Sequence, residues 1–569
     1  MLKIMMKLTW PGLLSAQKLA RFQAVSAACA ALTVLGAGTV AFPLGAVAQT
    51  TGPGVAAGVA PGVAAGVAMP ASVNPVFVIK GFNIAGENPL PDGDTSRVLA
   101  PFLRADATLD TLQKATSALE SALRDKGFAL HRVVLPPQEI GATVTLNIVK
   151  FVIGSVTVEG QSGYSEANIR ASLPALVEGG SPNFKAMAVQ TAIANENQGK
   201  QVQVTLKEAD APDRIDAKIV VKETRPWNFS ASLANTGSPA TGEDRFTVSG
   251  GHANVFGRDH QFVGAYTTSL EKPADVRQIG LNYRVPLYRL GGVVGVSFTR
   301  SDVIGNFGAF SSTGAGQTVG LTYNHHLAPV GGSRGYVGIS LDDKLFKAAE
   351  INGVAVQLSR RSRPLAIGYA ARVESDTSVW GYNADVAFNL GSGDDNTLLA
   401  YQSEDARITT NNWRALRGGG NFLTTFAGGW LWSLRGLFQY SAEALISGEQ
   451  FGLGGASSVR GTGERPIAGD SGLFASTEIS TREIMPGLRL LGFVDAGWLY
   501  NNNPNGNPKP ANDGLSSVGL GLRYSSQAGF AVSADFGRVV GASVLPYVLN
   551  SGIPQIGDQK LHINFSTRF

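Results

Sequence analysis

The amino-acid sequence predicts two small α+β domains followed by an antiparallel transmembrane β-barrel, and three observations indicate this fold class. Charged residues make up 16% of the chain and glycine 70 of its 569 residues, against usual shares of about 25% and about 7%. Apolar residues alternate with small or polar ones in many short runs after Pro226. Beyond the N-terminal region, no apolar run reaches the length of a membrane-spanning helix, about 20 residues. These features favour many strands with one apolar face and exclude a helical membrane protein.

Residues 1–48 have the composition of a secretory signal peptide. A basic start is followed by an apolar stretch and by the small-x-small triplet Ala46-Val47-Ala48, which is a typical cleavage site. The basic residues are Lys3, Lys7, Lys18 and Arg21. Because this segment has no acidic residue and the whole chain has a net charge of +4, the remainder is neutral, which argues against a nucleic-acid partner. The only cysteine, Cys29, is predicted to leave with the peptide, so no disulfide is expected.

Residues 49–75 repeat Gly-Val-Ala and are rich in glycine and proline, which predicts a flexible linker. Residues 76–151 then form a first α+β unit. A strand is expected over Phe77–Ile84, and a helix follows an N-cap at Thr108 and stops at Gly127. The apolar positions of this helix recur every three or four residues, at Leu109, Leu112, Ala115, Leu119 and Leu123. The unit closes with two strands, His131–Leu135 and Thr143–Phe151.

Residues 152–222 repeat the same order of elements, β-α-α-β-β, in a second unit of similar length. Its predicted elements are the strand Val152–Glu159, the helices Ser165–Leu173 and Phe184–Asn195, and the strands Gln201–Lys207 and Ile215–Lys222. Both units are too polar to be embedded in a membrane. Each would form one sheet with helices packed on it, which leaves a sheet edge open for pairing with another chain.

Residues 223–569 are predicted to form the barrel. Larger apolar residues alternate most clearly with smaller or polar ones in five runs, at 281–287, 382–390, 430–440, 518–524 and 561–569. Turn-rich stretches such as 391–396 and 501–514 separate such runs. A soluble antiparallel sandwich would alternate in the same way. The secretory leader, the aromatic residues near strand ends and the number of strands favour a closed barrel in a membrane.

Several motifs connect these regions to one known family. Within the first unit, Leu135-Pro136-Pro137-Gln138-Glu139-Ile140 runs into Val144 to Gly160, the strand pair that joins the first unit to the second. The start of the barrel contains Asn235-Thr236-Gly237 with Thr241-Gly242, and then Asn254-Val255-Phe256-Gly257-Arg258-Asp259. A long glycine-rich loop carries Val459-Arg460-Gly461, and a following strand carries Phe493-Val494-Asp495-Ala496-Gly497. With these motifs, nearly all of the chain after the signal peptide resembles the outer-membrane transporters of two-partner secretion, the haemolysin/haemagglutinin secretion-activation family of the POTRA–β-barrel superfamily.

This resemblance implies a location, a mechanism and a partner. The two α+β units would be periplasmic POTRA domains, and the barrel would cross the outer-membrane lipid with about 16 strands. The protein would recognise an unfolded secreted partner through its POTRA domains and export it through the barrel, without nucleotide, because folding of the partner outside biases the transfer. The partner would be a large, β-helical adhesin- or haemolysin-like protein. A barrel-assembly factor of the same superfamily is the alternative function, and a passive porin is a further one.

The glycine-rich loop and the following strand contain the predicted transport site. In Leu488–Tyr500 one set of alternating residues is apolar and would face lipid, so that the other set, with Arg489, Phe493 and Asp495, would face the lumen. The resemblance implies that the loop Phe451–Gly472, with seven glycines in 22 residues, folds back into the barrel and that Arg460 meets Asp495. An ordinary surface loop with a solvated arginine is the alternative. The expected site residues are Val459, Arg460, Gly461, Phe493, Asp495 and Gly497.

Thr462 departs from the family pattern, which usually has an aromatic residue after Val-Arg-Gly, and this raises the question of how the loop tip packs. The sequence has no phosphate loop, no His-Glu-x-x-His and no Rossmann glycine triplet after a strand. His325 and His326 are adjacent, and neighbouring residues of a strand face opposite ways, which argues against a shared metal ion. No catalytic residue, metal or cofactor is therefore expected, and the protein is not predicted to be an enzyme.

Overall fold

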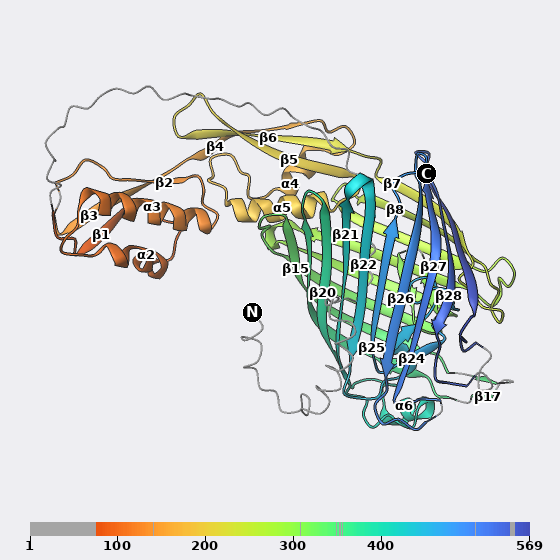
Figure 1. Ribbon diagram of the computed structural model, residues 1–569. Coiled ribbons are helices and arrows are strands. Elements are labelled where there is room, and N and C mark those ends of the chain that lie inside the picture. The colour runs from red at the N-terminus through yellow and green to blue at the C-terminus, as the bar shows by residue number, and fades with distance from the viewer. Residues whose placement is uncertain are drawn as a thin grey trace.

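The computed structural model describes residues 76–569, except residues 140, 308, 349, 352–353, 356, 507 and 547–551. The predicted signal peptide, 1–48, and the predicted linker, 49–75, lie outside the described residues. The described chain has three parts, two small sheet domains and a closed barrel (Figure 1). None of the helices in this part of the chain is both long enough and apolar enough to cross a membrane.

The first sheet domain has two helices and three strands. Their bounds are β1 Gly81–Gly86, α2 Asp92–Leu99, α3 Leu109–Asp125, β2 His131–Val134 and β3 Thr143–Lys150. β3 is the central strand, with β1 parallel and β2 antiparallel to it. The helix predicted after Thr108 is confirmed: the Thr108 N–H donates to the Thr111 hydroxyl at 3.1 Å. Leu112 and Leu119 of α3 are fully buried against the sheet, as their spacing predicts.

The first strand begins later than the sequence predicts. A strand was expected from Phe77, but β1 starts at Gly81. Phe77 instead forms an isolated bridge with Ala107, and the Ile79 N–H donates to the Arg104 carbonyl at 2.9 Å. These residues therefore bond with the segment before α3 and not with β3. Alternation alone cannot distinguish the two partners, because both pairings bury the same apolar side chains.

The second sheet domain repeats the order of the first. Its elements are β4 Val152–Glu159, α4 Glu166–Ser172, α5 Phe184–Asn195, β5 Lys200–Glu208 and β6 Arg214–Glu223. β6 is the central strand, so β4 and β5 are the edges of the sheet. α5 begins after Asn183, whose side chain accepts hydrogen bonds from the N–H groups of Lys185 and Ala186. The predicted strand at 152–159 and helix at 184–195 are confirmed.

A closed antiparallel barrel follows the sheet domains. Its strands are β7 Trp227–Ala234, β8 Arg245–Val255, β9 His260–Thr268, β10 Gln278–Leu287, β11 Gly292–Ser301, β14 Gly316–His326, β15 Ser333–Phe346, β18 Arg360–Ser362, β19 Pro364–Glu374, β20 Ser378–Asn389, β21 Arg414–Phe426, β22 Trp430–Tyr440, β25 Ser471–Ser480, β26 Leu488–Tyr500, β27 Asn512–Ser525, β28 Phe530–Gly541 and β29 Gln559–Arg568. β18 and β19 pair with successive parts of β15 and act as one strand, so the described barrel has 16 strands, the number that the resemblance implies. β29 pairs with β7 and closes it.

Short elements lie in the long connections at one end of the barrel. They are β12 Gly305–Phe307, β13 Phe310–Ser312, β16 Glu350–Ile351, β17 Val354–Ala355, α6 Leu398–Glu404, β23 Phe451–Leu453 and β24 Ile467–Gly469. The short 3₁₀ segments are Ala100–Phe102, Tyr288–Leu290, Ala427–Gly429 and Ser447–Glu449, the last in the connection that also holds β23 and β24. We call the end with α6 the loop end and the opposite end, where the second sheet domain lies, the domain end (Figure 1).

Alternation along the strands separates an apolar outer wall from the wall of the lumen. In β26, Leu490 and Val494 are 44% and 49% exposed on the outside, whereas Phe493 and Asp495 are 4% and 0% exposed on the inside. The facing predicted for this strand is therefore confirmed. Neighbouring strands continue both walls, because residues opposite each other in register share a face. Val494, for example, lies opposite Val518 of β27.

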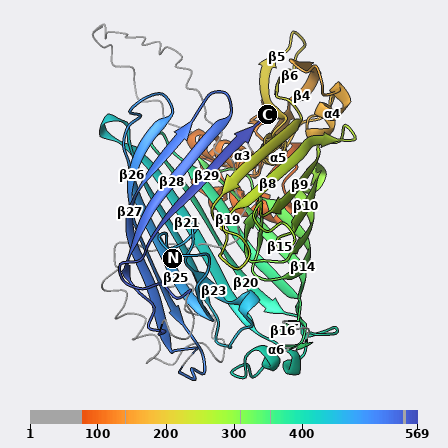
Figure 2. The ribbon, with the colours of Figure 1, turned by 90° about the vertical axis from the view of Figure 1, so that its right-hand side faces the viewer.

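The second sheet domain rests on the domain end of the barrel, over β8, β9 and β10, and the first domain lies farther away (Figure 2). α5 makes much of this contact. Val189 and Ile193 pack against Val293 of β11, and Glu196, directly after the helix, pairs with Arg284 of β10 at 2.9 Å. The domain and the barrel are thus held together by side chains as well as by the chain that links them.

Candidate functional site

The connection between β22 and β25, residues 441–470, turns back into the lumen. β23 and β24 form a short hairpin in it, with Phe451 opposite Gly469 and Leu453 opposite Ile467. Beyond the hairpin the chain reaches Val459, Arg460 and Gly461, which are buried. The structure therefore places the predicted loop inside the barrel and not on its surface.

Arg460 makes the main polar contacts between the buried end of this loop and the barrel wall. Its Nε and Nη2 donate to the two carboxylate oxygens of Asp495 on β26, each at 2.8 Å, and its backbone N–H donates to the same carboxylate at 3.1 Å. Its Nη1 donates to Glu478 of β25. The guanidinium carbon lies 3.5 Å from the centre of the Phe493 ring. The guanidinium and the carboxylate thus form a bidentate pair, because the planar guanidinium can donate two parallel hydrogen bonds. A lysine ammonium could not form such a pair.

Further charges extend this cluster along the lumen wall. Asp535 of β28 lies 3.6 Å from Arg460 and receives two hydrogen bonds from Arg523 of β27, at 2.7 and 2.8 Å. The Asp495 side chain is fully buried and that of Arg460 is 5% exposed. Burying such charges costs free energy that their pairing offsets, and removal of one partner leaves the other uncompensated. The position of the loop tip is therefore sensitive to each member of the pair.

Glycine is required where the loop tip touches the wall. Gly461 has a φ of +89°, and its N–H donates to Nε2 of His562 on β29 at 3.1 Å. A Cβ on Gly461 would lie 2.7 Å from the backbone of Gly537 on β28, and a Cβ on Gly537 would lie 2.6 Å from the Gly461 nitrogen. Two backbones meet here without side chains between them. A side chain at either position would displace the tip.

The other predicted site residues also contact the loop. Val459 is fully buried in an apolar cluster with Leu453, Phe474 and Leu499. A Cβ on Gly497 of β26 would lie 2.3 Å from the Leu453 side chain, so the missing side chain makes room for the hairpin. All six predicted residues are thus brought together at one contact between loop and wall.

Thr462, which stands where the family usually has an aromatic residue, stabilises the tip by hydrogen bonds. Its hydroxyl donates to the Val459 carbonyl at 2.8 Å and accepts from the Gly455 N–H at 3.0 Å. The residue is 4% exposed. The tip is therefore closed by a local network, which answers the question that this departure raised.

Sequence reasoning missed Glu478, Asp535 and His562. Each is one of the alternating residues of its strand that face the lumen, and this facing was the only feature of the sequence that could have indicated a role. Many other polar residues share the same parity, so it could not single out these three. Their proximity to Arg460 depends on which strands are neighbours and on how far each is shifted along the barrel.

A second buried ion pair joins the second sheet domain to the barrel. Lys200 at the start of β5 contacts Asp259, in the turn between β8 and β9, at 2.6 Å, and the two side chains are 0% and 2% exposed. Asp259 also accepts from the Tyr288 hydroxyl at 2.8 Å, and Lys200 donates to Asn168 at 3.0 Å. Burial lowers the pKa of Lys200, and the Asp259 carboxylate opposes this effect. We call this set of residues the joint.

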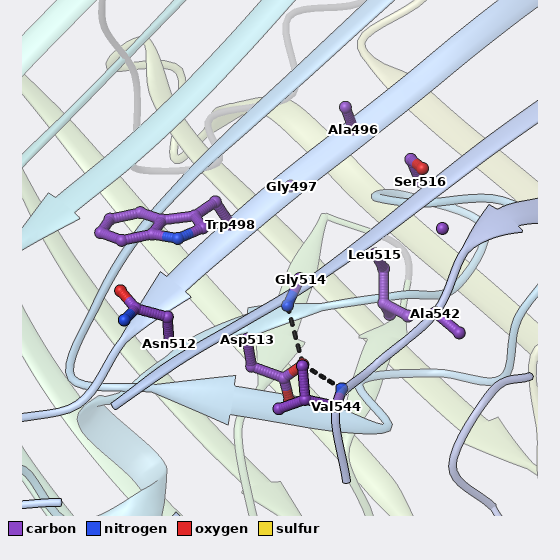
Figure 3. Close-up of a pocket in the computed structure, with 11 residues that line it drawn as sticks. Ala496, Gly497, Trp498, Asn512, Asp513, Gly514, Leu515, Ser516, Ala542 and Val544 are labelled. Carbon is purple, nitrogen blue, oxygen red and sulfur yellow. Dashed lines mark hydrogen bonds between the residues drawn. The ribbon is translucent and has the colours of Figure 1, made fainter. Parts of the chain in front are cut away.

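The remaining candidates do not form a site for chemistry. Within the described ranges, no group of three or more histidine, cysteine, aspartate and glutamate side chains could hold a metal ion. His326 lies 3.5 Å from Glu196 of the second sheet domain, which places it in the contact with α5. A groove near the loop end of the barrel is lined by Trp498, Gly514 and Val544 (Figure 3). The carboxylate of Asp513, which also lines the groove, accepts hydrogen bonds from the backbone N–H groups of Gly514 and Val544.

The family model described as haemolysin secretion/activation protein ShlB/FhaC/HecB matches residues 213–524, and a model of the POTRA domain, ShlB-type, matches residues 77–150. The chain is 24% identical over 446 residues to the outer membrane transporter CdiB of Dickeya dadantii (strain 3937), which covers 75% of this chain and 77% of that protein. Its fold is similar to CdiB from Escherichia coli, with a TM-score of 0.67, 18% identity and coverage of 88% and 92%. The fold of CdiB from Acinetobacter baumannii is also similar, with a TM-score of 0.66, 17% identity and coverage of 97% and 98%.

Proposed function

The chain belongs to the haemolysin secretion/activation protein family ShlB/FhaC/HecB, and we propose that it exports an unfolded partner through a barrel gated by the loop that carries Arg460. It is an outer-membrane transporter that secretes a partner protein, and it is not an enzyme. The domain end of the barrel then faces the periplasm and the loop end faces the outside. We assign residues 76–151 and 152–222 to two POTRA domains and residues 223–569 to the barrel. The POTRA match over residues 77–150 supports the first assignment.

The observation that carries the gating proposal is a lumen occupied by a loop whose tip is held by charges and hydrogen bonds, with Val459 as its one large apolar contact. Arg460 binds Asp495 and Glu478, and the tip around it is rich in glycine. Water and polar groups that enter with a substrate weaken ion pairs far more than they weaken an apolar core. Such a tip can leave its place and return, which is what a reversible gate requires.

The open edge of β5 is the proposed docking site for the partner. The outer edge of β4 is covered: Ile153 bonds with Gly179 and Gly180, and the Val156 N–H donates to Glu178. On β5, only the start of the outer edge is occupied, where the Asn195 side chain bonds with both backbone groups of Val202. Beyond it, Val204 and Leu206 lie on an edge that no other strand of the described sheet covers.

An extended polypeptide can add a strand to such an edge through main-chain hydrogen bonds, which need little sequence specificity and suit an unfolded client. The partner we propose is a large, β-helical adhesin- or haemolysin-like protein. The family description, which names haemolysin secretion, supports this class. The outer wall of the barrel contacts the outer-membrane lipid, and no nucleotide or nucleic acid takes part in the proposal.

The docking proposal is tested by Val204→Pro, with Val204→Ala as the matched control. Proline removes the outward N–H that an added strand would use, and proline is tolerated on an edge whose N–H faces solvent. Both variants lose the valine side chain, so only the proline variant should stop secretion. Equal secretion from both variants, at equal barrel abundance, would contradict docking on β5.

The transport function is tested by comparing the secreted proteins with the outer-membrane inventory in a strain that lacks this chain. Loss of one large secreted protein, with the other barrels unchanged, is the expected result. A general loss of outer-membrane barrels would indicate an assembly factor instead. Unchanged secretion together with altered uptake of small solutes would indicate a porin.

A further inference from the structure

The loop that enters the lumen is held at three places, and only one of them is the tip. Residues 441–453 form its first stem, residues 454–466 its tip and residues 467–470 its second stem. Arg460 and Gly461 hold the tip against β25, β26, β28 and β29. A buried carboxylate holds each stem, and neither carboxylate takes part in the contacts of the tip.

Glu449 holds the first stem to the opposite side of the barrel. Its carboxylate accepts from Nη2 of Arg417 on β21 at 2.8 Å and from the Ser362 hydroxyl on β18 at 2.9 Å, and it lies 3.2 Å from Nζ of Lys344 on β15. Glu449 is 3% exposed. Next to it, residues 444–446 are buried in an apolar cluster at the loop end of the barrel. Two cations and an apolar anchor therefore fix this stem.

Asp470 holds the second stem to the loops at the same end. Its carboxylate accepts from Nη1 of Arg407 at 3.1 Å, from the N–H groups of Asn502 and Leu445, each at 2.9 Å, and from the side chain of Gln450 at 3.1 Å. The residue is fully buried. Arg407 belongs to the segment that follows α6, which lies at the loop end of the barrel (Figure 1). Because Leu445 and Gln450 are on the first stem, Asp470 also ties the two stems together.

The tip differs from the stems in composition and in backbone conformation. Val459 is its only large apolar residue. Gly454 and Gly455 at its start have φ angles of +104° and +95°, and Arg465 near its end has a φ of +48°. Residues in this region of φ mark places where the chain turns sharply, and glycine passes through many such conformations without steric cost. The tip thus begins at two glycines and ends beside Arg465, whose guanidinium donates to the carbonyls of Ser447 and Gln450 on the first stem. The chain between these two points can change course while the stems stay in place.

From these contacts we infer that Glu449, Asp470 and Arg407 are positioning residues, which keep both stems of the loop inside the barrel during transport while only the tip, residues 454–466, moves aside. This inference rests on the proposed function. Displacing the whole loop would expose Glu449 and Asp470 without partners and remove both Phe451 and Leu453 from their apolar cluster. Displacing the tip leaves these groups in place: it removes Val459 from the cluster and breaks the hydrogen bonds of Arg460, Arg465 and their neighbours. The loop then acts as a fixed frame with a movable end.

A disulfide between the second stem and the wall tests this inference directly. A Cβ on Gly469 would lie 3.1 Å from the Leu499 Cβ, and a shift of a few tenths of an ångström would bring the two into the usual disulfide range of about 3.5–4.5 Å. Because Cys29 is the only natural cysteine, the full chain with Gly469→Cys and Leu499→Cys can be compared oxidised and reduced. Export in the oxidised form should stay within about twofold of the reduced form. If oxidation abolishes export and reduction restores it, the stem must leave its place and the inference fails.

A bridge at the tip is the matched comparison. Asn306 Nδ2 lies 3.3 Å from Ser457 Oγ, between the connection after β11 and the tip. Joining Asn306→Cys to Ser457→Cys with the shortest bis-methanethiosulfonate should lower export by about tenfold or more, reversibly on reduction. Unchanged export with this bridge in place would contradict a movement of the tip.

The positioning role of Asp470 needs a readout that separates it from general stability. Asp470→Asn should lower export at equal barrel abundance, and the oxidised bridge at the neighbouring position 469 should restore it, because the covalent bond replaces the lost ion pair. Arg407→Met should be rescued in the same way. If the bridge does not restore export in either variant, these residues do more than hold the stem, and the assignment is wrong.

Channel conductance of the purified full chain in planar bilayers distinguishes the two proposals, since it needs no partner. The tip bridge should suppress openings and the stem bridge should leave them unchanged. If the strain without this chain secretes normally while these conductance results hold, the proposed function fails and the inference about the loop stands. If the stem bridge alone closes the channel, the inference fails whatever the secretion result.

Discussion

Two buried cations hold separate parts of this transporter to the barrel, and their surroundings differ. Arg460 lies in the lumen, with a side chain that is 5% exposed, and binds Asp495 and Glu478 from a loop tip whose one large apolar residue is Val459. Lys200 lies in the joint, with a side chain that is 0% exposed, and binds Asp259. Beside the joint, Val189 and Ile193 of α5 pack against Val293. The contact of the tip combines several charges with one aliphatic side chain, Val459. The joint has one ion pair and lies beside a helix that packs two aliphatic side chains on the barrel.

The difference indicates which contact is built to open. An arginine that shares several acceptors along a polar lumen can exchange them for water one at a time, so the barrier to release is low. Opening the joint would expose Lys200 and the apolar side chains of Val189 and Ile193 at the same time. We therefore expect the loop tip to move during transport and the second sheet domain to keep its orientation over the barrel.

The largest effect is expected from the pair Arg460 and Asp495. Arg460→Ala should reduce export by about tenfold or more and increase conductance, because removal of one partner from a buried pair costs about 3–5 kcal/mol and frees the tip. Asp495→Ala should act in the same direction. The double variant should be little worse than either single one, since coupled residues are not additive. Secretion and bilayer conductance measure these changes at equal barrel abundance.

Faster migration of the unheated barrel in detergent gels controls for folding of these variants, because strand pairing does not depend on the loop. Full export from the Arg460 variant would contradict a role of this site in transport. Additive losses in the double variant would contradict the pairing and would mean that each residue acts separately.

Lys200→Met is expected to have the next largest effect. It leaves Asp259 buried without its cation, so the joint should loosen. The distribution of distances between spin labels on β5 and on the barrel should then become broader. Export should fall several-fold. Adding Asp259→Leu should narrow the distance again, because a buried ion pair can be replaced by apolar residues at little cost. If Lys200→Met alone gives a distance distribution as narrow as that of the unchanged protein, the packing of Val189 and Ile193 against Val293 is enough to orient the domain.

The sequence predicted most of the fold because its elements repeat local patterns. Alternation located β26 at Leu488–Tyr500 and its inner face, and spacing located α3, which begins at Leu109 after the N-cap Thr108. Motifs pointed to Arg460 and Asp495, and the structure places them within hydrogen-bond distance. The start of β1 was wrong because two pairings would satisfy the same pattern.

The joint and the stems of the loop could not be predicted in this way. Lys200 begins a strand and has the appearance of an ordinary surface lysine until the second sheet domain is placed on the turn that holds Asp259. Glu449 and Asp470 bind arginines that lie 32 and 63 residues away along the chain. These contacts depend on the tertiary arrangement, and neither the local composition nor the spacing of apolar residues indicates them.

A smaller effect is expected where the tip meets the wall at Gly537. Gly537→Ala places a Cβ 2.6 Å from the Gly461 nitrogen, so the tip should shift by a few tenths of an ångström and conductance should rise modestly, with export reduced about two- to fivefold. Gly492→Ala on β26 is the matched control, because its nearest neighbour would be 3.9 Å away. Equal behaviour of the two variants would show that the tip does not need this close approach.

The smallest effect is expected from Glu196→Gln, directly after α5, which removes the second ionic contact between the sheet domain and the barrel. Glu196 and Arg284 are 26% and 32% exposed, and pairs that water reaches contribute only about 0.2–1 kcal/mol. Export should therefore stay within about twofold of the unchanged protein, and added salt should reduce the difference further by screening. Lys218→Met, which breaks an exposed pair with Glu159 within the sheet domain, gives the baseline for such changes. A loss as large as that of Lys200→Met would mean that α5 is held by charge and not by Val189 and Ile193, and the contrast between joint and loop tip would no longer stand.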